Sequence, residues 1–257
     1  MSDALSLGEP ADETQWRALV EQGLKGAKWE RLVGKTADGI PVQPLYGEMD
    51  IATATDVSGF PGAAPFVRGD AAGAWTIRQS YEHPDPAQTN AEILADLAGG
   101  VGGIELVLGE SGVSIDDARD LDVALADVIL EVAPVSLDAG VRGLWAAELL
   151  RTKLKGVAAS GTALNVDPIG ALMREGAQGV DRYHVARLVA HLRYELPAAR
   201  VLRADARPVH ETGGTEAQEI AAALCSGIAY LQMIGAYLIS DAHKILSFAV
   251  SVGPDVL

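Results

Sequence analysis

The sequence predicts an α/β protein with a parallel sheet, and three observations favour it. After Ala74, short runs of β-type residues alternate with helical stretches, which is the pattern of consecutive βαβ units. Hydrophobic residues make up 49% of the chain but aromatic residues only 5%, so the core must consist of Ala, Val, Leu and Ile, as in helices packed on parallel strands. The length of 257 residues suits one large domain of this class.

Strands and helices can be placed in order after residue 74. We expect strands at Trp75–Tyr81, Ile104–Leu108, Val135–Asp138, Thr162–Asp167, Arg200–Ala206 and Ser247–Val252. We expect helices at Pro86–Ala98, Asp116–Leu130, Gly143–Lys155, Val180–Leu196, Thr215–Ile234 and Tyr237–Leu246. A closed TIM-type barrel needs about eight strands, so residues 74–257 are predicted to form an incomplete (β/α) barrel of about six βα units. Its open strand edges need cover from a partner, from the N-terminal arm or from further sequence.

Residues 1–73 are predicted to form an N-terminal arm. Within Asp12–Val33, the residues Trp16, Leu19 and Leu24 recur at helical spacing, which predicts an amphipathic helix. The segment Thr36–Gly73 is rich in Pro and Gly and is too long for an ordinary connection inside a compact domain. We therefore expect an extended element that wraps around or binds another surface.

The acidic composition limits the possible partners. The chain has 35 Asp and Glu against 20 Lys and Arg, a formal net charge of -15. Such a charge repels phosphate backbones and anionic lipids, so neither nucleic acid nor a membrane surface is an expected partner. An acyl-CoA is also an anion, and its binding would need a local basic pocket.

The cellular location follows from the cysteine content and the hydropathy pattern. Cys225 is the single cysteine, so no disulfide can form within the chain, and its position in an apolar helical run predicts a buried side chain. No stretch reaches the ~18 apolar residues of a membrane-spanning helix, and the N-terminus does not resemble an export signal. A cytoplasmic protein is expected.

Three motifs before the βα series carry a family resemblance. They are T-x-D-G-I-x-x-x-P-L-Y at Thr36–Tyr46, F-P-G-x-x-P-F-x-R-G at Phe60–Gly69 and W-T-I-R-Q at Trp75–Gln79. In this order they resemble the N-terminal part of the adenosylcobalamin-dependent methylmalonyl-CoA mutase family, and weaker similarity continues at Leu164–Gly170 and Val209–Gly214. The resemblance implies a TIM-type barrel that holds an acyl-CoA along its axis for a radical rearrangement of methylmalonyl-CoA to succinyl-CoA. In the family, a separate C-terminal domain brings the cobalamin.

The resemblance also implies roles for individual residues. Thr76, Arg78 and Gln79 match positions that contact substrate in the family. Ser80 occupies the position of the family's catalytic tyrosine, and Gly73 that of an arginine which clamps the substrate carboxylate. The adjacent Tyr81 is no substitute for that tyrosine, because neighbouring side chains on a strand point to opposite faces.

Two retained residues leave alternatives open. His210 matches the family's active-site histidine, although Val209 replaces the tyrosine that normally precedes it, and a loop histidine without a catalytic role is an equal alternative. Arg78 can bind an anion or pair with a nearby acid such as Glu105, and the pairing is slightly favoured.

Other suggestive patterns have simpler explanations. Asp241-Ala-His243 resembles the D-x-H-x-x-G cobalamin motif, but its sixth position is Leu246, so we interpret it as a turn of helix. Asn165 and Asp167 could be polar ligands, yet Asp before Pro also commonly caps a helix. The glycines between the first helix and the second strand are better explained as a helix C-cap and turn than as a phosphate loop: Gly99, Gly100, Gly102 and Gly103.

Two functional hypotheses follow. The first is a small, non-catalytic subunit that stabilises a large catalytic mutase subunit in a heterodimer, with adenosylcobalamin in the complex but not held by this chain alone. The second is a catalytic acyl-CoA mutase chain, in a heterodimer or a homodimer, whose cobalamin domain is supplied separately. The replacement of the tyrosine by Ser80 and of the arginine by Gly73 favours the first. An unrelated barrel enzyme would need a nucleophile that the sequence does not reveal.

Overall fold

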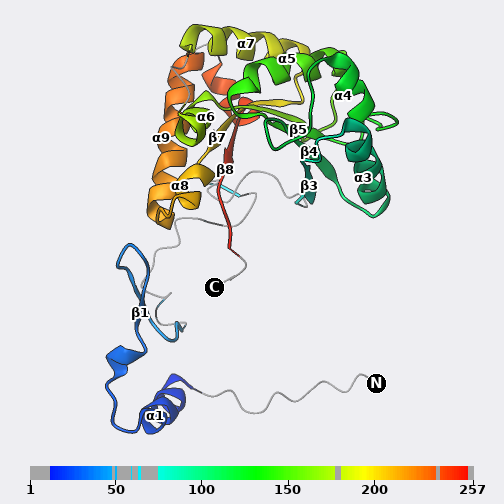
Figure 1. Ribbon diagram of the computed structural model, residues 1–257. Helices are drawn as coiled ribbons and strands as arrows, with labels where there is room; N and C mark the ends of the chain where they lie inside the picture. Colours follow the sequence, from blue (N-terminus) through cyan, green and yellow to red (C-terminus); the bar gives the residue numbers. More distant parts are fainter. Residues whose placement is uncertain are drawn as a thin grey trace. The chain divides into compact units, whose positions relative to one another are not determined.

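The structure, a computed structural model, describes residues 12–47, 50, 59, 63–64, 75–176, 181–235 and 238–253 (Figure 1). The chain divides into two compact units, Met1–Ala74 and Trp75–Leu257. Most of the Phe60–Gly69 motif and Gly73 lie outside the described residues.

The first unit contains short elements. Helix α1 spans Glu13–Leu24, and the Asp12 side chain caps it by accepting a hydrogen bond from the Gln15 backbone N–H. A 3₁₀ turn at Trp29–Arg31 follows, and then strand β1 (Gly34–Lys35) pairs antiparallel with β2 (Pro41–Val42). The helix predicted to reach Val33 ends at residue 24, because Lys25 and Gly26 adopt left-handed backbone conformations. Helix α1 contains no buried residue, so its packing within the first unit is slight.

The second unit contains a six-stranded sheet whose strands are all parallel. The strands are β3 (Arg78–Tyr81), β4 (Gly103–Val107), β5 (Val135–Asp138), β6 (Ala163–Val166), β7 (Arg200–Asp205) and β8 (Leu246–Ala249). They pair in chain order from β3 to β8. The predicted parallel α/β arrangement is therefore confirmed, although the first strand begins at residue 78 and not at residue 75.

Helices connect the strands and surround the outside of the curved sheet (Figure 1). They are α3 (Pro86–Ala98), α4 (Ala118–Ala124), α5 (Gly143–Leu154), α6 (Pro168–Glu175), α7 (Arg182–Glu195), α8 (Arg207–Glu211), α9 (Glu216–Ile234) and α10 (Ala242–Ile245), with 3₁₀ turns at Gly140–Arg142 and Ile239–Asp241. Helices α6 and α8 were not predicted, and α4 is shorter than predicted. Asp127, with φ of 59°, lies in the turn that follows α4.

The two faces of the sheet differ in chemistry. The face toward the helices is apolar: residues such as Ile104, Leu137 and Leu202 are at most 1% exposed and pack in one core with helix residues such as Leu150. Because side chains alternate along a strand, the intervening residues point to the other face. That second face carries the polar side chains of the strands, and it is the place to look for a site.

Two smaller predictions have opposite outcomes. The glycine cluster does end a helix, since Gly99 is the C-cap of α3 and β4 begins at Gly103. Cys225, in contrast, is exposed, so the prediction that it is buried was wrong. The reason is that α9 carries apolar residues on its outer side as well, including Ile220 and Leu224, so an apolar run did not identify its buried face. Among the described residues, no helix is both long enough and apolar enough to cross a membrane.

Candidate functional site

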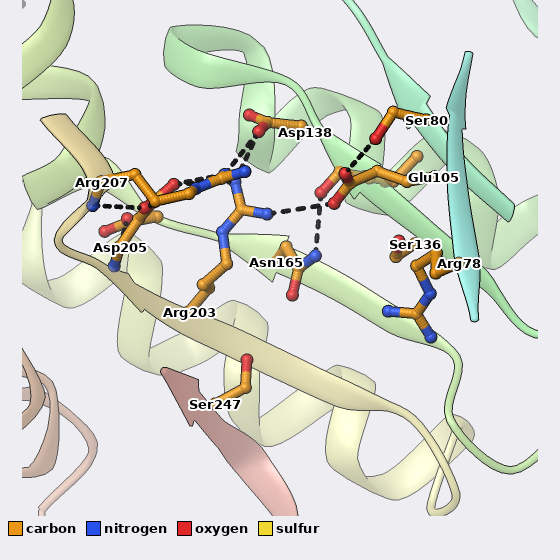
Figure 2. A network of polar contacts seen from close by, with 12 residues as sticks. Arg78, Ser80, Glu105, Ser136, Asp138, Asn165, Arg203, Asp205, Arg207 and Ser247 are labelled. Atoms are coloured by element: carbon orange, nitrogen blue, oxygen red, sulfur yellow. Dashed lines mark hydrogen bonds and ion pairs between the residues drawn. The ribbon is translucent and has the colours of Figure 1, made fainter. Parts of the chain in front are cut away.

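The polar face is the sheet face opposite the helix-packed core. We define it by the strand residues that point there: Arg78, Ser80, Glu105, Ser136, Asp138, Asn165, Arg203, Asp205 and Ser247 (Figure 2). The register places several of them side by side, with Ser80 opposite Glu105, Glu105 opposite Ser136, and Arg203 opposite Ser247. Each of the six strands therefore contributes at least one polar side chain to this face.

Arg203 lies at the centre of an ion-pair network on the polar face (Figure 2). Its Nη1 lies 3.4 Å from a carboxylate oxygen of Glu105, and its Nη2 lies 3.0 Å from Asp138 and 3.3 Å from Asp205. The Arg203 side chain is only 7% exposed, so a charge without partners would be costly there. Its three acidic neighbours supply that compensation.

Two further arginines complete the network. Arg207, just beyond β7, donates to Asp205 at 2.6 Å and to Asp138 at 2.7 Å. Arg174, on α6, lies 3.1 Å from Asp205 and 3.7 Å from Asp138. The charge network is therefore made of three guanidinium groups and three carboxylates, and its formal charges cancel: Arg174, Arg203, Arg207, Glu105, Asp138 and Asp205.

The network shifts the ionisation of its members. Burial alone would raise the pKa of Asp205, but the hydrogen bonds from Arg207 and the charges of Arg203 and Arg207 together hold that pKa below its ordinary value. The bond to Asp205 correspondingly raises the pKa of Arg207, against the effect of burial. Both groups are therefore ionised at neutral pH.

Ser80 joins the network through Glu105. Its hydroxyl donates a 2.8 Å hydrogen bond to the Glu105 carboxylate, whose other oxygen faces Arg203. Ser80 itself is exposed, so the polar face is open to solvent at β3, whereas Arg203 and Asp205 farther along the sheet are buried. The neighbouring Tyr81 points to the core face, where it is 3% exposed and donates to Asp96 on α3. The prediction that Tyr81 faces away from Ser80 is confirmed.

Arg78 does not form the ion pair with Glu105 that the sequence favoured. Its Nη2 instead donates a 2.7 Å hydrogen bond to the backbone carbonyl of Gly161, in the loop before β6. The register explains this, because Arg78 lies opposite Gly103 and is two residues out of step with Glu105. Burial lowers the pKa of Arg78; the charge of Glu105 opposes this shift and that of Arg203 adds to it.

A buried carboxylate lies next to the network. Asp167 caps α6 by accepting from Gly170 N–H at 2.9 Å, and it also accepts from Asp205 N–H at 3.0 Å and from the Tyr230 hydroxyl of α9. Burial raises the pKa of Asp167 although these hydrogen bonds oppose the shift. Asp167 is therefore the helix cap that the sequence suggested, and it connects α6, α9 and the end of β7.

Small-molecule ligands usually occupy cavities of about 300–1,000 Å³. A cavity of about 920 Å³ opens at the carboxyl ends of the strands. Asp138, Arg174 and Arg207 line this cavity, together with the acidic residues Glu110 and Glu211. Ligands of parallel α/β proteins commonly bind at this end of the sheet. Here Arg174 and Arg207 are already paired with Asp138 and Asp205, which leaves the two arginines poorly available to an anion.

The other predicted site residues are dispersed. Thr76 is exposed and precedes β3, and Gln79 alternates to the face of Tyr81. His210, on α8, lies 3.4 Å from Glu219 on α9, away from the carboxylates of the charge network. His243 is exposed on α10, directly before β8, which places it at the amino end of the sheet. The structure thus brings Arg78 and Ser80 to one face but does not gather all the predicted residues.

Several residues of the network were missed from the sequence. They are Asp138, Arg174, Arg203, Asp205 and Arg207. A signal was available for two of them, because Arg203 and Asp205 alternate with Leu202 and Ala204 inside an otherwise apolar strand. Asn165, whose own φ is 49°, has a local role: its side chain donates a 3.0 Å hydrogen bond to the Leu137 carbonyl. Within the described ranges, no group of three or more His, Cys, Asp or Glu side chains could hold a metal ion.

These features define an α/β protein whose parallel strands pair in chain order and whose polar face carries the charge network. The family model described as methylmalonyl-CoA mutase matches residues 35–109 and 105–257, so the chain belongs to the methylmalonyl-CoA mutase family. It is 38% identical to a methylmalonyl-CoA mutase small subunit of Streptomyces virginiae, over 90% of this chain and 40% of that protein.

Two relatives of lower identity are also methylmalonyl-CoA mutase chains. The chain is 29% identical to the methylmalonyl-CoA mutase small subunit of Propionibacterium freudenreichii subsp. shermanii, over 95% of this chain and 41% of that protein. It is 26% identical to a methylmalonyl-CoA mutase of Escherichia coli, over 94% of this chain and 39% of that protein. The chain therefore spans about two fifths of the length of these relatives.

Proposed function

We propose that this chain is a small-subunit-type component of a methylmalonyl-CoA mutase, and that it supports a large catalytic subunit without catalysing the reaction itself. The complex would be an isomerase that converts methylmalonyl-CoA to succinyl-CoA. The relatives named as small subunits support the subunit type, and the replacement of the family's tyrosine by Ser80 supports the non-catalytic role.

The observation that carries this proposal is the chain of contacts from Ser80 through Glu105 to Arg203. At the position where the family has a phenol ring, a small hydroxyl donates to a carboxylate, and that carboxylate is paired with a buried arginine. The charged groups beyond Glu105 satisfy one another. Such a network favours a stable fold over the binding and activation of a thioester, which needs unpaired groups aimed at the substrate.

Among the described residues, those of the one motif that suggested a cobalamin ligand do not fit adenosylcobalamin. His243, the one candidate for an axial ligand that the motif suggested, is exposed on a four-residue helix at the amino end of the sheet. The adjacent Asp241 lies 3.4 Å from Lys244 and 3.7 Å from Arg193, and is thus engaged in ion pairs. We infer that the cofactor, if present in the complex, is held by another part of the assembly.

We also propose that the six strands belong to a TIM-type barrel and that residues 1–73 form a wrapping arm. The strand order supports the barrel, because a doubly wound sheet reverses its order whereas a barrel does not. The unburied α1 helix and exposed residues such as Leu19, Ile40 and Tyr46 support an arm that packs on another surface. A larger catalytic subunit in a heterodimer is the proposed partner, and the cytoplasm the proposed location.

The roles suggested by the family resemblance remain predictions. Arg78 is bonded to the Gly161 carbonyl, so contact with an acyl-CoA would require that bond to be exchanged. Thr76 and Gln79 are exposed, although Gln79 Nε2 donates to the Ser80 carbonyl. His210 would have to leave Glu219 to act on a substrate.

A reconstitution assay tests the proposal. The purified chain, given adenosylcobalamin and methylmalonyl-CoA, should form no succinyl-CoA above background. Co-expression with a large mutase subunit should yield a stable complex whose turnover is unchanged by His210→Ala in this chain. Turnover by this chain alone that His210→Ala abolishes would refute the non-catalytic role, and the absence of a complex would refute the subunit role.

A further inference from the structure

The outer side of helix α9 carries no charge along most of its length. From Ile220 to Ser240 the sequence contains no Asp, Glu, Lys, Arg or His, although α9 lies on the outside of the sheet (Figure 1). Helices in that position normally present charged side chains to solvent, as α4 does with Asp122 and α7 with Arg187. A helix that is apolar on its outer side as well is normally covered by another surface. The outer side of α9 therefore has the character of an interface.

A row of large apolar residues and a row of small residues lie side by side on α9. Ile220, Leu224 and Ile228 recur every four residues and are 54–55% exposed. Ala221 and Cys225, also four residues apart and exposed, form the neighbouring row. Rows with this spacing are the ridges and grooves by which helices pack on one another. An antiparallel second α9 can therefore place its large row in the small row of the first and receive the first helix's large row in return, as a two-fold contact requires.

The apolar surface continues from α9 onto the edge strand β8. A Cβ added at Gly227 would lie 2.8 Å from the ring of Phe248, so this ring lies against the middle of α9. Phe248 is nevertheless 53% exposed, and Val250, which shares its face, is 48% exposed. We define the apolar patch by the exposed large residues of both elements: Ile220, Leu224, Ile228, Phe248 and Val250.

The size and charge of the apolar patch fit a contact between two copies of this chain. A half-exposed large side chain offers roughly 100 Å², so the patch and the small residues beside it offer about 600 Å² per copy. Two copies would bury about 1,200 Å², which is the lower limit of stable, specific interfaces. Each copy carries a formal charge of -15, so two copies repel each other where acidic surfaces meet. A contact between two uncharged sides avoids that repulsion.

We propose that the apolar patch is a two-fold contact between two copies of this chain, with the α9 helices antiparallel and crossing near Leu224 and Cys225. An uncharged patch gives a basic or acidic partner no charge to recognise, whereas a second copy supplies the matching rows. Because the buried area is at the lower limit, the dimer is reversible, with a dissociation constant in the micromolar range. This contact goes beyond the proposed function, since it involves neither a large subunit nor an acyl-CoA.

Sedimentation equilibrium of the full chain, without a large subunit, tests the contact. The wild-type chain should dimerise reversibly at concentrations below about 100 μM. Ile228→Glu would bury a charge in the contact and should raise the dissociation constant about tenfold or more. Ile129→Glu is the matched control, because it makes the same change at a 65% exposed isoleucine between α4 and β5. It should dimerise as the wild type does.

The single cysteine gives a second measurement, on the wild-type chain itself. In the proposed contact the two Cys225 side chains lie close to the two-fold axis, so a short bis-maleimide should join two chains. The covalent dimer should form about tenfold more slowly or less in Ile228→Glu but at the wild-type rate in Ile129→Glu.

Three results would overturn the proposal. The first is a chain that stays monomeric up to about 100 μM, and resistance of Cys225 to maleimide in that monomer would assign the cover of α9 to another part of the same chain. The second is a dimer that Ile228→Glu weakens no more than Ile129→Glu does. The third is a dimer that the bis-maleimide does not join through Cys225. None of these results bears on the subunit role, which the reconstitution with a large subunit tests separately.

Discussion

The hydroxyl of Ser80 donates a 2.8 Å hydrogen bond to the carboxylate of Glu105, its direct neighbour in the parallel register of β3 and β4. This contact connects Ser80 to the charge network, since Glu105 also lies 3.4 Å from Arg203. The Ser80 hydroxyl, at the position where the family resemblance implies a tyrosine, therefore has a polar partner in the structure. A single substitution at this position alters one contact of the network without supplying the other parts of an active site.

Ser80→Tyr should fold but should not create mutase activity. Because Ser80 is exposed, a tyrosine ring can extend into solvent, and the loss of one hydrogen bond should lower the free energy of unfolding by about 0.5–1.5 kcal/mol. Urea denaturation measures that change. Succinyl-CoA formation by the variant, with adenosylcobalamin and methylmalonyl-CoA, should stay at background. Ser80→Ala is the control for the lost hydrogen bond, and turnover by Ser80→Tyr would contradict the non-catalytic role.

Arg203→Met should destabilise the protein by about 3–5 kcal/mol, because it leaves Glu105, Asp138 and Asp205 without their central cation in a buried site. The free energy of unfolding from urea denaturation measures the loss. Arg119→Met provides the same substitution in the exposed pair with Asp117, where the arginine side chain is 90% exposed. It should change stability by less than about 0.5 kcal/mol. Equal effects of the two substitutions would show that the network contributes little.

The alternation of strands and helices could be predicted because each buried strand is a short apolar run between turn residues. Strand β5 was placed within its observed bounds, and α3 was placed at Pro86–Ala98 as observed. Helices α6 and α8 were missed because both are short and begin near a proline that follows a strand, where the sequence indicates only an exit from the strand. The lengths of the helices and strands were less predictable than their order, because tertiary packing sets those lengths.

The site was less predictable than the fold because its contacts depend on register. Arg203 and Glu105 are 98 residues apart, and nothing in their local sequences specifies that they meet. The favoured pairing of Arg78 with Glu105 failed for the same reason, since the register puts Arg78 beside Gly103. The capping role of Asp167 was foreseen because it depends on local sequence, with Pro168 directly after it.

Gly103→Ala should destabilise the edge strand β3. An added Cβ would lie 3.2 Å from Nε of Arg78 and 3.4 Å from Pro134, so Arg78 must move and strain its bond to the Gly161 carbonyl. We expect a loss of about 1–3 kcal/mol in the free energy of unfolding, with faster amide exchange in β3. Gly143→Ala is the control, because its Cβ would meet Val166 at an ordinary 3.8 Å. An unchanged stability of Gly103→Ala would show that Arg78 adjusts freely.

Asp167 and Asp205 should give opposite pH dependences of stability. The folded-state pKa of Asp205 is lowered, so its contribution to the free energy of unfolding is present above the unfolded value of about 3.9 and is lost as the pH falls through the folded value. The folded-state pKa of Asp167 is raised, so its contribution is full below about 3.9 and declines as the pH rises through the folded value.

Urea denaturation of Asp167→Asn, Asp205→Asn and wild type across this pH range measures both effects. As the pH rises from about 4 toward neutral, Asp167→Asn should gain stability relative to wild type, because the asparagine has no charge to bury. As the pH falls below about 4, the deficit of Asp205→Asn relative to wild type should shrink, because wild type then loses the ionised carboxylate that Arg207 and Arg203 stabilise. Parallel pH profiles for the two variants would contradict the opposite shifts, and with them the conclusion that the charge network holds Asp205 ionised while Asp167 bears the penalty of burial.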